Sequence, residues 1–262
     1  MPEPRIIILC GRSPRHLYVA NRLCRDTNVL AIVHEAPAQW TGEKLRKNLK
    51  PDVFFRKTSR WLRDRRRYAG NPEAKFFFGS DRPALDRMDL VRDVPSVSDP
   101  QTLALAEELQ PDVICVFGTS LIRGPLLERF TLMNLHGGLS PEYRGADCTF
   151  WALYNGEPEK VGCTLHYIDP GIDTGKLIAH VCPEVHTGDD ELVLFWRAVM
   201  DSAEVYAEAI ARFVAGDLPG IAQEGKGKLY QVKDRTWASE REMVRRTKHM
   251  GYPSLGHRVV WF

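Results

Sequence analysis

Several short stretches of the chain are apolar at almost every position, a pattern typical of strands that are buried on both faces of a sheet. The first stretch, residues 6–10, ends at Gly11, and a second strong one covers residues 111–118. We expect strands at these two places and also at 28–33, 75–78, 131–134, 162–168, 176–182 and 226–230.

Between these stretches the apolar positions recur every three or four residues, which indicates helices. Asp99 suits the N-cap of one such segment, and Pro100 suits its first helical position. Gly216 is well placed to end the longest helical pattern. The predicted helices cover residues 15–25, 99–110, 126–130, 145–155 and 189–215.

The chain thus opens with strand, helix and strand, and this alternation favours an open α/β sheet. Its 262 residues suit one large domain, or one domain with a small appendage. We expect a core at 1–185 that includes an insertion-like basic segment at 36–88. A long helix and a C-terminal extension then follow at 186–262.

The basic segment stands apart from the rest of the chain. Residues 44–67 contain eleven Lys or Arg, with aromatic and leucine side chains interleaved. Such a run is common on the solvated face of amphipathic helices. It can also contact phosphates or another anionic partner, so a nucleic-acid-binding module is the non-enzymatic alternative. The formal net charge of +2 does not by itself imply a nucleic-acid partner, and we do not expect one.

Composition narrows the class of protein further. The hydrophobic share of 44% and the charged share of 27% are ordinary for a globular protein. The six cysteines form no CxxC pair and no metal-ligand spacing, so we expect reduced thiols, a cytoplasmic location and no bound metal. The apolar run before Gly11 is too short for a signal peptide. No run approaches the roughly 20 residues of a membrane span, so we expect no membrane association.

Polar groups that could carry chemistry follow two of the predicted strands. Asn134 and His136 are separated by one residue, so their side chains point to the same face where the strand ends. Gly137 and Gly138 leave room for a ligand to approach the backbone. Asp173 stands in a later Pro-Gly turn that could bring its carboxylate to the imidazole.

These three side chains suit the transfer of an acyl-level carbon to an amine. His136 can take the proton that the attacking nitrogen loses and pass it to the leaving nitrogen. The Asn134 amide can donate to an oxyanion, and Asp173 can orient the imidazole. Cys148 is only a weak candidate nucleophile, which favours direct transfer. Asn and Asp also form ordinary turns, so spacing alone leaves a structural interpretation open.

Two further loops are candidates for substrate contact. Residues 11–13 follow the first strand at its carboxyl end, where ligands bind in open α/β sheets, although a plain turn is the other interpretation. Residues 140–145 form a polar loop directly after the Asn134–His136 pair. The residues that we expect to contact the substrate are Gly11, Arg12, Ser13, Ser140 and Arg144.

Three motifs together resemble a known family. Residues 134–145 (NLHGGLSPEYRG) resemble the Asn-x-His pair and Pro-x-x-Arg-Gly loop of the formyltransferases that use 10-formyltetrahydrofolate. Residues 162–166 (GCTLH) resemble that family's G-x-T-x-H strand, and residues 173–175 (DTG) its Asp-Thr-Gly element. The resemblance covers residues 111–182 well and residues 1–35 loosely.

The resemblance implies a fold, a co-substrate and a set of site residues. The fold would be Rossmann-like: an open, mostly parallel sheet with helices on both faces, plus a small C-terminal extension. The co-substrate would be 10-formyltetrahydrofolate, with Asn134, His136 and Asp173 as the catalytic residues. The folate would be bound by Phe117, Gly118, Leu121, Ile122, Asp169 and Gly171, the last two in a turn that closes over it.

The acceptor is less closely specified. The His-Gly-Gly sequence and the aromatic-rich residues 150–156 resemble the sugar-nucleotide N-formyltransferases. We therefore expect a small, phosphate-bearing acceptor with the amino group on a nucleotide-linked sugar. Methionyl-tRNA is less expected, because enzymes for that acceptor carry a substantial C-terminal barrel and fewer than 50 residues follow the predicted long helix here. A hydroxyornithine-type amine, hydrolysis of formyltetrahydrofolate and assembly as a homodimer stay open.

Overall fold

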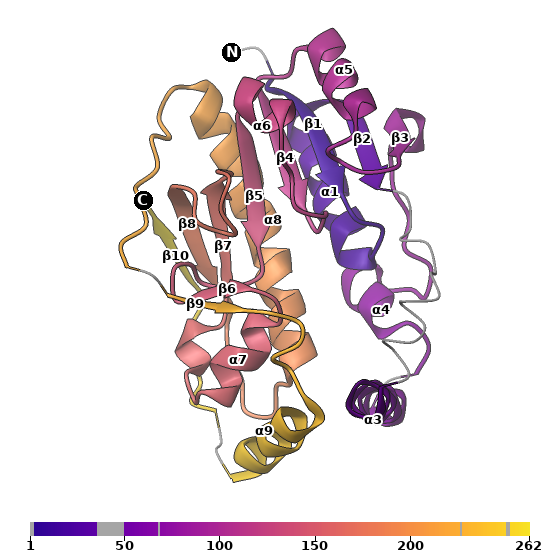
Figure 1. Ribbon diagram of the computed structural model, residues 1–262, viewed down its shortest axis with the longest axis vertical. Coiled ribbons are helices and arrows are strands. Elements are labelled where there is room, and N and C mark those ends of the chain that lie inside the picture. The colour runs from indigo at the N-terminus through magenta and orange to yellow at the C-terminus, as the bar shows by residue number, and fades with distance from the viewer. Residues whose placement is uncertain (1–2, 36–49, 68, 226, 250–251) are drawn as a thin grey trace.

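The computed structural model describes residues 3–35, 50–67, 69–225, 227–249 and 252–262. Within these residues the main sheet has eight strands in the order β10-β8-β7-β5-β4-β1-β2-β3 (Figure 1). The parallel strands are β1 (Arg5–Cys10), β2 (Asn28–Glu35), β3 (Val91–Val94), β4 (Val113–Phe117) and β5 (Leu132–His136). The antiparallel strands are β7 (Cys163–Tyr167), β8 (Leu177–Cys182) and β10 (Arg258–Trp261).

Helices cover both faces of this sheet, and the strands supply apolar side chains to each. On one face α1 (Pro14–Asp26) packs against α8 (Glu191–Val214), with α4 (Pro72–Phe78) beside them. The other face carries α5 (Pro100–Leu109) and α6 (Pro125–Arg129). In β1, Ile6 and Ile8 join the core under α1 and α8, whereas Ile7 and Leu9 join the core of the other face. Alternate residues of a fully apolar strand thus serve two cores, and the predicted fold class is confirmed.

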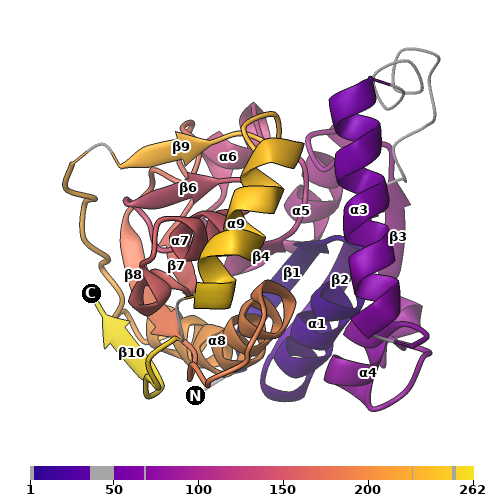
Figure 2. The same ribbon diagram turned by 90° about the horizontal axis from the view of Figure 1, so that it is seen from below.

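A second group of elements gathers at the carboxyl ends of the parallel strands (Figure 1). It consists of α3 (Pro51–Arg67), α7 (Cys148–Tyr154), α9 (Trp237–His249) and a two-stranded sheet of β6 (Tyr143–Gly145) and β9 (Lys228–Tyr230). The helices α3 and α9 lie side by side although they are far apart in the sequence (Figure 2). Short 3-10 turns at Met88–Leu90 and Pro158–Lys160 complete the elements of the described residues.

One predicted strand is wrong: residues 75–78 belong to α4. The Asn71 side chain caps this helix by accepting a hydrogen bond from the Ala74 amide, and Pro72 occupies its first turn. Gly79 ends the helix in the left-handed conformation, with φ of 67°. These end signals outweigh the β propensity of three consecutive phenylalanines.

The other predicted strands and helices are present, with small changes at their ends. In the basic segment, residues 51–67 form α3, and residues 36–49 lie outside the described residues. The tail contains the expected strand as β9, and it also contains α9 and β10, which we did not predict. Among the described helices, none combines the length and the apolar character that crossing a bilayer would require.

The centre of the sheet opens between β4 and β5, and a tyrosine from α8 bridges the opening. The Ile114 amide donates to Thr131 O, so the next bond of a regular parallel ladder would join the Val116 amide to Met133 O. The Tyr206 hydroxyl stands there instead, accepting from Val116 N at 2.9 Å and donating to Met133 O at 2.7 Å.

Candidate active site

A cavity of about 770 Å³ lies at the carboxyl ends of β4 and β5. One side, which we call the loop wall, consists of residues 117–122 after β4 and residues 171–173 after β7. A second side, the α7–α8 wall, consists of the lining residues Asp147, Phe150, Glu191, Leu192 and Phe195. Asn134, His136 and His166 line the same cavity. Its volume and mixed lining are those of a small-molecule site.

The pairing of β5 with β7 brings a second histidine to the predicted pair. In the antiparallel register Asn134 lies opposite His166, and His136 lies opposite Thr164. Directly opposed residues share a face of the sheet, so all four side chains point the same way. The Asn134 Nδ2 lies 3.1 Å from His166 Nε2.

The hydrogen bonds of His166 determine its tautomer and orient the Asn134 amide. His166 Nδ1 lies 2.7 Å from the backbone oxygen of Tyr167, which can only accept, so Nδ1 carries the proton. Nε2 then presents a lone pair that accepts one N–H of Asn134. The amide has two N–H groups, and the second remains to donate to a group bound in the cavity.

His136 is held in the complementary tautomer. Its Nε2 lies 3.0 Å from the backbone oxygen of Tyr143 and therefore carries the proton. The lone pair is on Nδ1, 3.4 Å from Asp173 Oδ2. Burial lowers the pKa of His136, and the neighbouring Asp173 charge offsets only part of that effect. At neutral pH the ring is thus a neutral base, with a carboxylate in place to stabilise it once it is protonated.

Asp173 occupies a backbone conformation that few residues adopt. Its φ is 52°, in the left-handed region, where Asp is among the more tolerated side chains. The Gly145 amide donates to Oδ2 at 2.9 Å, and His166 Nε2 lies 3.6 Å from Oδ1. Burial raises the pKa of this carboxyl, but the two imidazoles and the Gly145 N–H outweigh it and lower the pKa to about 2. Asp173 is therefore ionised throughout the neutral range.

Thr164 explains the threonine of the G-x-T-x-H pattern. Its buried hydroxyl donates to Gly138 O at 2.7 Å and accepts from Ser140 N at 2.9 Å. A Cβ at Gly138 would lie 2.5 Å from the Cys148 Cβ and 2.6 Å from Tyr143 O. The loop after His136 is thus fixed by one side chain of β7 and by a close approach that requires glycine.

Cys148 contacts the candidate base but is not suited to act as a nucleophile. Its sulfur lies 3.6 Å from His136 Nε2 and 3.7 Å from Gly145 O. Burial, together with the nearby Asp173 and Asp147 charges, raises the pKa of the thiol far above its usual value. The thiol therefore stays protonated, which agrees with the weak role given to it from the sequence.

The predicted folate residues gather at the loop wall. Phe117, Gly118, Leu121, Ile122 and Gly171 all line the cavity. Asp169 does not, because its carboxylate is turned into its own loop. There it accepts from Gly171 N at 3.0 Å and from the Thr174 hydroxyl at 2.6 Å. These contacts shape the turn, and the assigned folate-binding roles stay predictions.

The five predicted substrate residues lie outside the cavity lining. Gly11 packs so closely on His16 that a Cβ would lie 2.3 Å from its Nδ1, and Ser13 is the N-cap of α1. Arg12 pairs with Asp93 at the surface, at 2.5 Å. Ser140 is wholly buried, and Arg144 donates to Gly227 O at 3.1 Å. Their direct contact with a substrate stays a prediction.

Other cavity residues were not predicted. They include His166, His16, Arg15, Glu73, Arg60, Asp147 and Glu191. His166 could have been found, because it ends the G-x-T-x-H pattern and an antiparallel partner of β5 would place it opposite Asn134. The others come from helices whose docking has no local signal in the sequence.

Comparison with known families agrees with this geometry. The family model described as formyl transferase matches residues 17–210, which is well over half of the chain. The chain belongs to the formyl transferase family, as the motifs predicted.

Individual relatives differ in how much of the chain they share. The methionyl-tRNA formyltransferase of Synechococcus sp. (strain JA-2-3B'a(2-13)) is 34% identical over 136 residues, which are 50% of this chain and 42% of that protein. The chain thus spans less than half the length of this curated relative.

Two solved structures are similar over almost the whole chain. A sugar N-formyltransferase from Shewanella sp FDAARGOS_354 has a TM-score of 0.60 and 13% identity, and the match covers 99% of this chain and 96% of that one. An N-formyltransferase from Helicobacter canadensis, solved with folinic acid and dTDP-3-aminofucose, has a TM-score of 0.57 and 17% identity. That match covers 94% of this chain and 81% of the other. At these identities the likeness shows the fold.

Proposed function

We propose that the protein transfers a formyl group from 10-formyltetrahydrofolate to a primary amine. The observation that carries the proposal is the cluster of Asn134, His136, His166 and Asp173 on one wall of a large cavity. In this cluster a free amide N–H, a neutral imidazole lone pair and an ionised carboxylate converge. This combination serves acyl transfer between two nitrogens.

The cavity is compatible with a reduced folate. Its volume of about 770 Å³ is within the usual range for small-molecule sites. Phe117, Ile122 and Ile172 give the loop wall an apolar surface for a flat ring system, and Ile168 lines the cavity as well. When bound, the folate supplies an activated formyl carbon. The residues of the chain must then orient it, stabilise charge and move one proton.

Asn134 and His136 divide the work of the transfer step. As the amine nitrogen bonds to the formyl carbon, the free N–H of Asn134 donates to the formyl oxygen, where negative charge builds. The lone pair of His136 Nδ1 accepts the proton that the amine loses. When the carbon–nitrogen bond to the folate breaks, the same Nδ1 returns this proton to N10 of the leaving tetrahydrofolate.

Asp173 stabilises the protonated form of His136 between these two proton transfers. Its Oδ2 lies 3.4 Å from Nδ1, so imidazolium formation places a positive charge beside a fixed negative one. His166 orients the Asn134 amide by accepting its other N–H. The acceptor amine must arrive uncharged, because a protonated amine has no lone pair with which to attack.

For the acceptor we propose the amino group of a nucleotide-linked sugar. A fold shared with a sugar N-formyltransferase over 99% of the chain supports this choice, as does a similar N-formyltransferase solved with dTDP-3-aminofucose. The α7–α8 wall combines aromatic and carboxylate side chains, which suits a hydroxylated ring. Methionyl-tRNA is the second candidate, because curated relatives with that acceptor share half of the chain.

The direct test is a screen of acceptors with product mass as the readout. Enzyme and 10-formyltetrahydrofolate are incubated with dTDP- and UDP-linked amino sugars, hydroxyornithine, methionyl-tRNA or no amine. We expect a mass increase of one formyl group on an amino-sugar nucleotide. Formate release at the same rate with and without every amine would instead identify a hydrolase.

Variants test the assigned roles. His136→Ala and Asp173→Ala should remove most of the transfer activity while donor affinity stays within about tenfold, because both residues handle the proton rather than bind the donor. Asn134→Ala should lower the rate of the chemical step by about 10²–10³, as loss of one oxyanion donor does. His186→Ala, at an exposed ring outside the cavity, is the matched control. Near-wild-type turnover in His136→Ala would contradict the assignment.

A further inference from the structure

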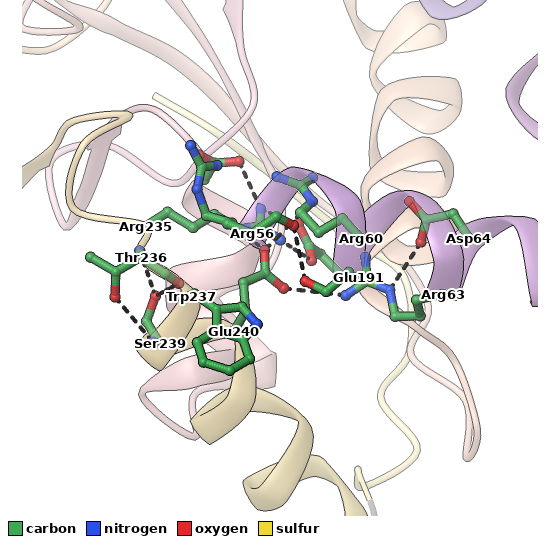
Figure 3. A network of polar contacts seen from close by, with 12 residues as sticks. Arg56, Arg60, Arg63, Asp64, Glu191, Arg235, Thr236, Trp237, Ser239 and Glu240 are labelled. Atoms are coloured by element: carbon green, nitrogen blue, oxygen red, sulfur yellow. Dashed lines mark hydrogen bonds and ion pairs between the residues drawn. The ribbon is translucent and has the colours of Figure 1, made fainter. Parts of the chain in front are cut away.

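A dense ionic network joins Glu191 of the α7–α8 wall to Arg235 and Glu240, and Glu240 in turn to arginines of α3 (Figure 3). Its centre is Arg235, from the segment between β9 and α9, whose side chain is fully buried. The guanidinium donates to Asp147 Oδ1 at 2.7 Å and to both oxygens of Glu191, at 2.7 and 2.8 Å. Its Nε donates to Glu240 at 2.7 Å, and its face lies 4.0 Å above the Phe150 ring. Five contacts thus fix one guanidinium.

Two of these carboxylates face the cavity, whereas the arginine does not. Asp147 and Glu191 both line it, with side chains about 23% and 15% exposed. A carboxylate has about four lone-pair positions, and Arg235 uses one on Asp147 and two on Glu191. Lone pairs therefore remain on both groups for hydrogen-bond donors in the cavity.

Asp147 departs from the usual geometry of a helix N-cap. It is the N-cap residue of α7, where an aspartate normally accepts from the backbone of the first turn. Here the side chain makes no capping bond, and the backbone is left-handed with φ of 57°. Departures of this kind are expected where a residue serves a site rather than the fold.

Asp147 is adjacent in the chain to a residue that contacts the candidate base. The next residue, Cys148, contacts His136 Nε2 at 3.6 Å. An aromatic ring accompanies the two acids, since Phe195 lines the same wall. Paired carboxylates next to aromatic faces are complementary to a ring that carries hydroxyl groups, because the acids accept from O–H and the rings cover C–H faces.

We propose that Asp147 and Glu191 determine acceptor specificity by accepting hydrogen bonds from ring hydroxyls of the acceptor. Arg235 is the positioning residue that holds both carboxylates toward the cavity. The inference rests on the proposed function, since a sugar acceptor supplies the hydroxyl donors. Arg235 and Glu240 lie beyond residue 210, where the match to the family model ends. Asp147 and Glu191 lie within the matched residues, so only the positioning part of this network falls outside the family model.

Kinetics of full-length variants on the amino-sugar nucleotides of the acceptor screen test this assignment. Asp147→Asn and Glu191→Gln keep the side-chain shape but weaken acceptance from hydroxyls. We expect each to raise the acceptor KM at least about tenfold, the cost of losing a hydrogen bond to a charged group. The donor KM and kcat should stay within about twofold, because neither carboxylate handles the proton. Glu242→Gln, at a partly exposed carboxylate on α9 that pairs with Arg245 and Arg246 outside the cavity lining, is the matched control and should change nothing.

Arg235→Lys tests positioning separately, because lysine keeps the charge but cannot bridge two carboxylates in the same planar geometry. It should raise the acceptor KM without altering donor affinity. Analogues of dTDP-3-aminofucose that lack one ring hydroxyl provide a second measurement, which does not depend on how well a variant folds. The analogue that lacks the recognised hydroxyl should lose affinity with wild-type enzyme but lose little more with Asp147→Asn or Glu191→Gln.

Failure of the proposed acceptor and failure of the inference about Asp147 and Glu191 give different results. If wild-type enzyme formylates no amino-sugar nucleotide, the proposed acceptor is wrong and the inference falls with it. If wild-type enzyme formylates one, but Asp147→Asn and Glu191→Gln keep the wild-type acceptor KM, the inference alone is overturned. An equal loss of donor and acceptor affinity in both variants would also overturn it, because that pattern marks a merely structural role.

Discussion

At the scale of single residues, the candidate site depends on which ring nitrogen of each histidine carries a proton. Backbone oxygens determine the tautomers. Tyr143 O accepts a hydrogen bond from His136 Nε2–H, and Tyr167 O accepts one from His166 Nδ1–H. The two rings therefore present opposite lone pairs, Nδ1 toward Asp173 and Nε2 toward Asn134. Hydrogen bonds to the backbone thus make one histidine a candidate base and let the other orient the Asn134 amide.

The titration of His136 gives the sharpest residue-level prediction. Burial lowers its pKa below the usual 6.5, and Asp173 opposes that shift. In the wild-type protein we expect the His136 ring to titrate with a midpoint below pH 6.5, as measured by proton NMR of its C–H groups. In Asp173→Asn the opposing charge is absent, so the midpoint should move further down. A midpoint above 6.5, or one that rises in Asp173→Asn, would contradict the assigned environment.

The residues that the sequence identified are those whose relationship is local. Asn134 and His136 share a face because they are two apart on one strand, and Asp173 was found through an ordered motif. Asp147 and Arg235 are 88 residues apart, and no periodicity relates them. These two residues could not be predicted as cavity neighbours, because their positions follow from how α7, α8 and α9 dock.

At the scale of elements, β7 acts as the scaffold of the site. Thr164 fixes the loop after β5, and His166, two residues further on the same face, orients Asn134. A strand supplies two such side chains at a fixed spacing because alternate residues share a face. The G-x-T-x-H pattern is thus one strand performing two tasks.

Replacing Thr164 should separate these tasks. Thr164→Val keeps the shape but leaves Gly138 O and Ser140 N without their partner in a fully buried place. We expect the free energy of unfolding to fall by about 2–4 kcal/mol, from two unsatisfied backbone groups. Urea denaturation measures this loss, and Thr164→Ser, which keeps the hydroxyl, should recover most of it. Equal stability of the Val and Ser variants would mean that the loop does not depend on this hydroxyl.

Sequence patterns predicted an element well where all its residues are buried. They failed where the signals at the ends of a helix determine the secondary structure. The apolar run at residues 6–10 became β1 because both faces of the sheet are covered. Residues 75–78 became part of a helix because Asn71, Pro72 and Gly79 define its two ends. Those end signals were present in the sequence, and three adjacent phenylalanines concealed them. β10 escaped prediction because its strand is short and half-exposed.

At the scale of the whole molecule, the cavity is formed where the sheet order reverses and where parallel pairing gives way to antiparallel pairing. β1 and β4 are neighbours in the sheet. The chain leads from β1 to β2 on one side and from β4 to β5 on the other, which leaves a crevice at the carboxyl ends of β1 and β4. β7 runs antiparallel beside β5 and brings its own residues to the same edge. The family match covers β4, β5 and β7, whereas β1 precedes it and Arg235 and β10 follow it.

Buried histidines should make the stability of the whole molecule sensitive to acid. Burial lowers the pKa of His16 to about 3, and it also lowers the pKa values of His34, His136 and His180. The unfolded chain takes up protons on these rings below 6.5, whereas the folded protein does not. Stability should therefore be fully present above 6.5 and decline as pH falls toward the folded pKa values.

His16 allows this effect to be measured at one position. The lowered pKa of His16 alone should reduce the free energy of unfolding by about 2 kcal/mol between pH 6.5 and about pH 5. Each pH unit below the pKa of the unfolded chain costs about 1.4 kcal/mol. His16→Asn keeps an acceptor for the Ser13 amide, which Nδ1 contacts at 3.3 Å, but cannot titrate in this range. Its free energy of unfolding, from urea curves at several pH values, should fall less steeply with acidification than that of the wild type by about this amount. Parallel slopes for wild type and His16→Asn would show that His16 is not held neutral in the folded protein.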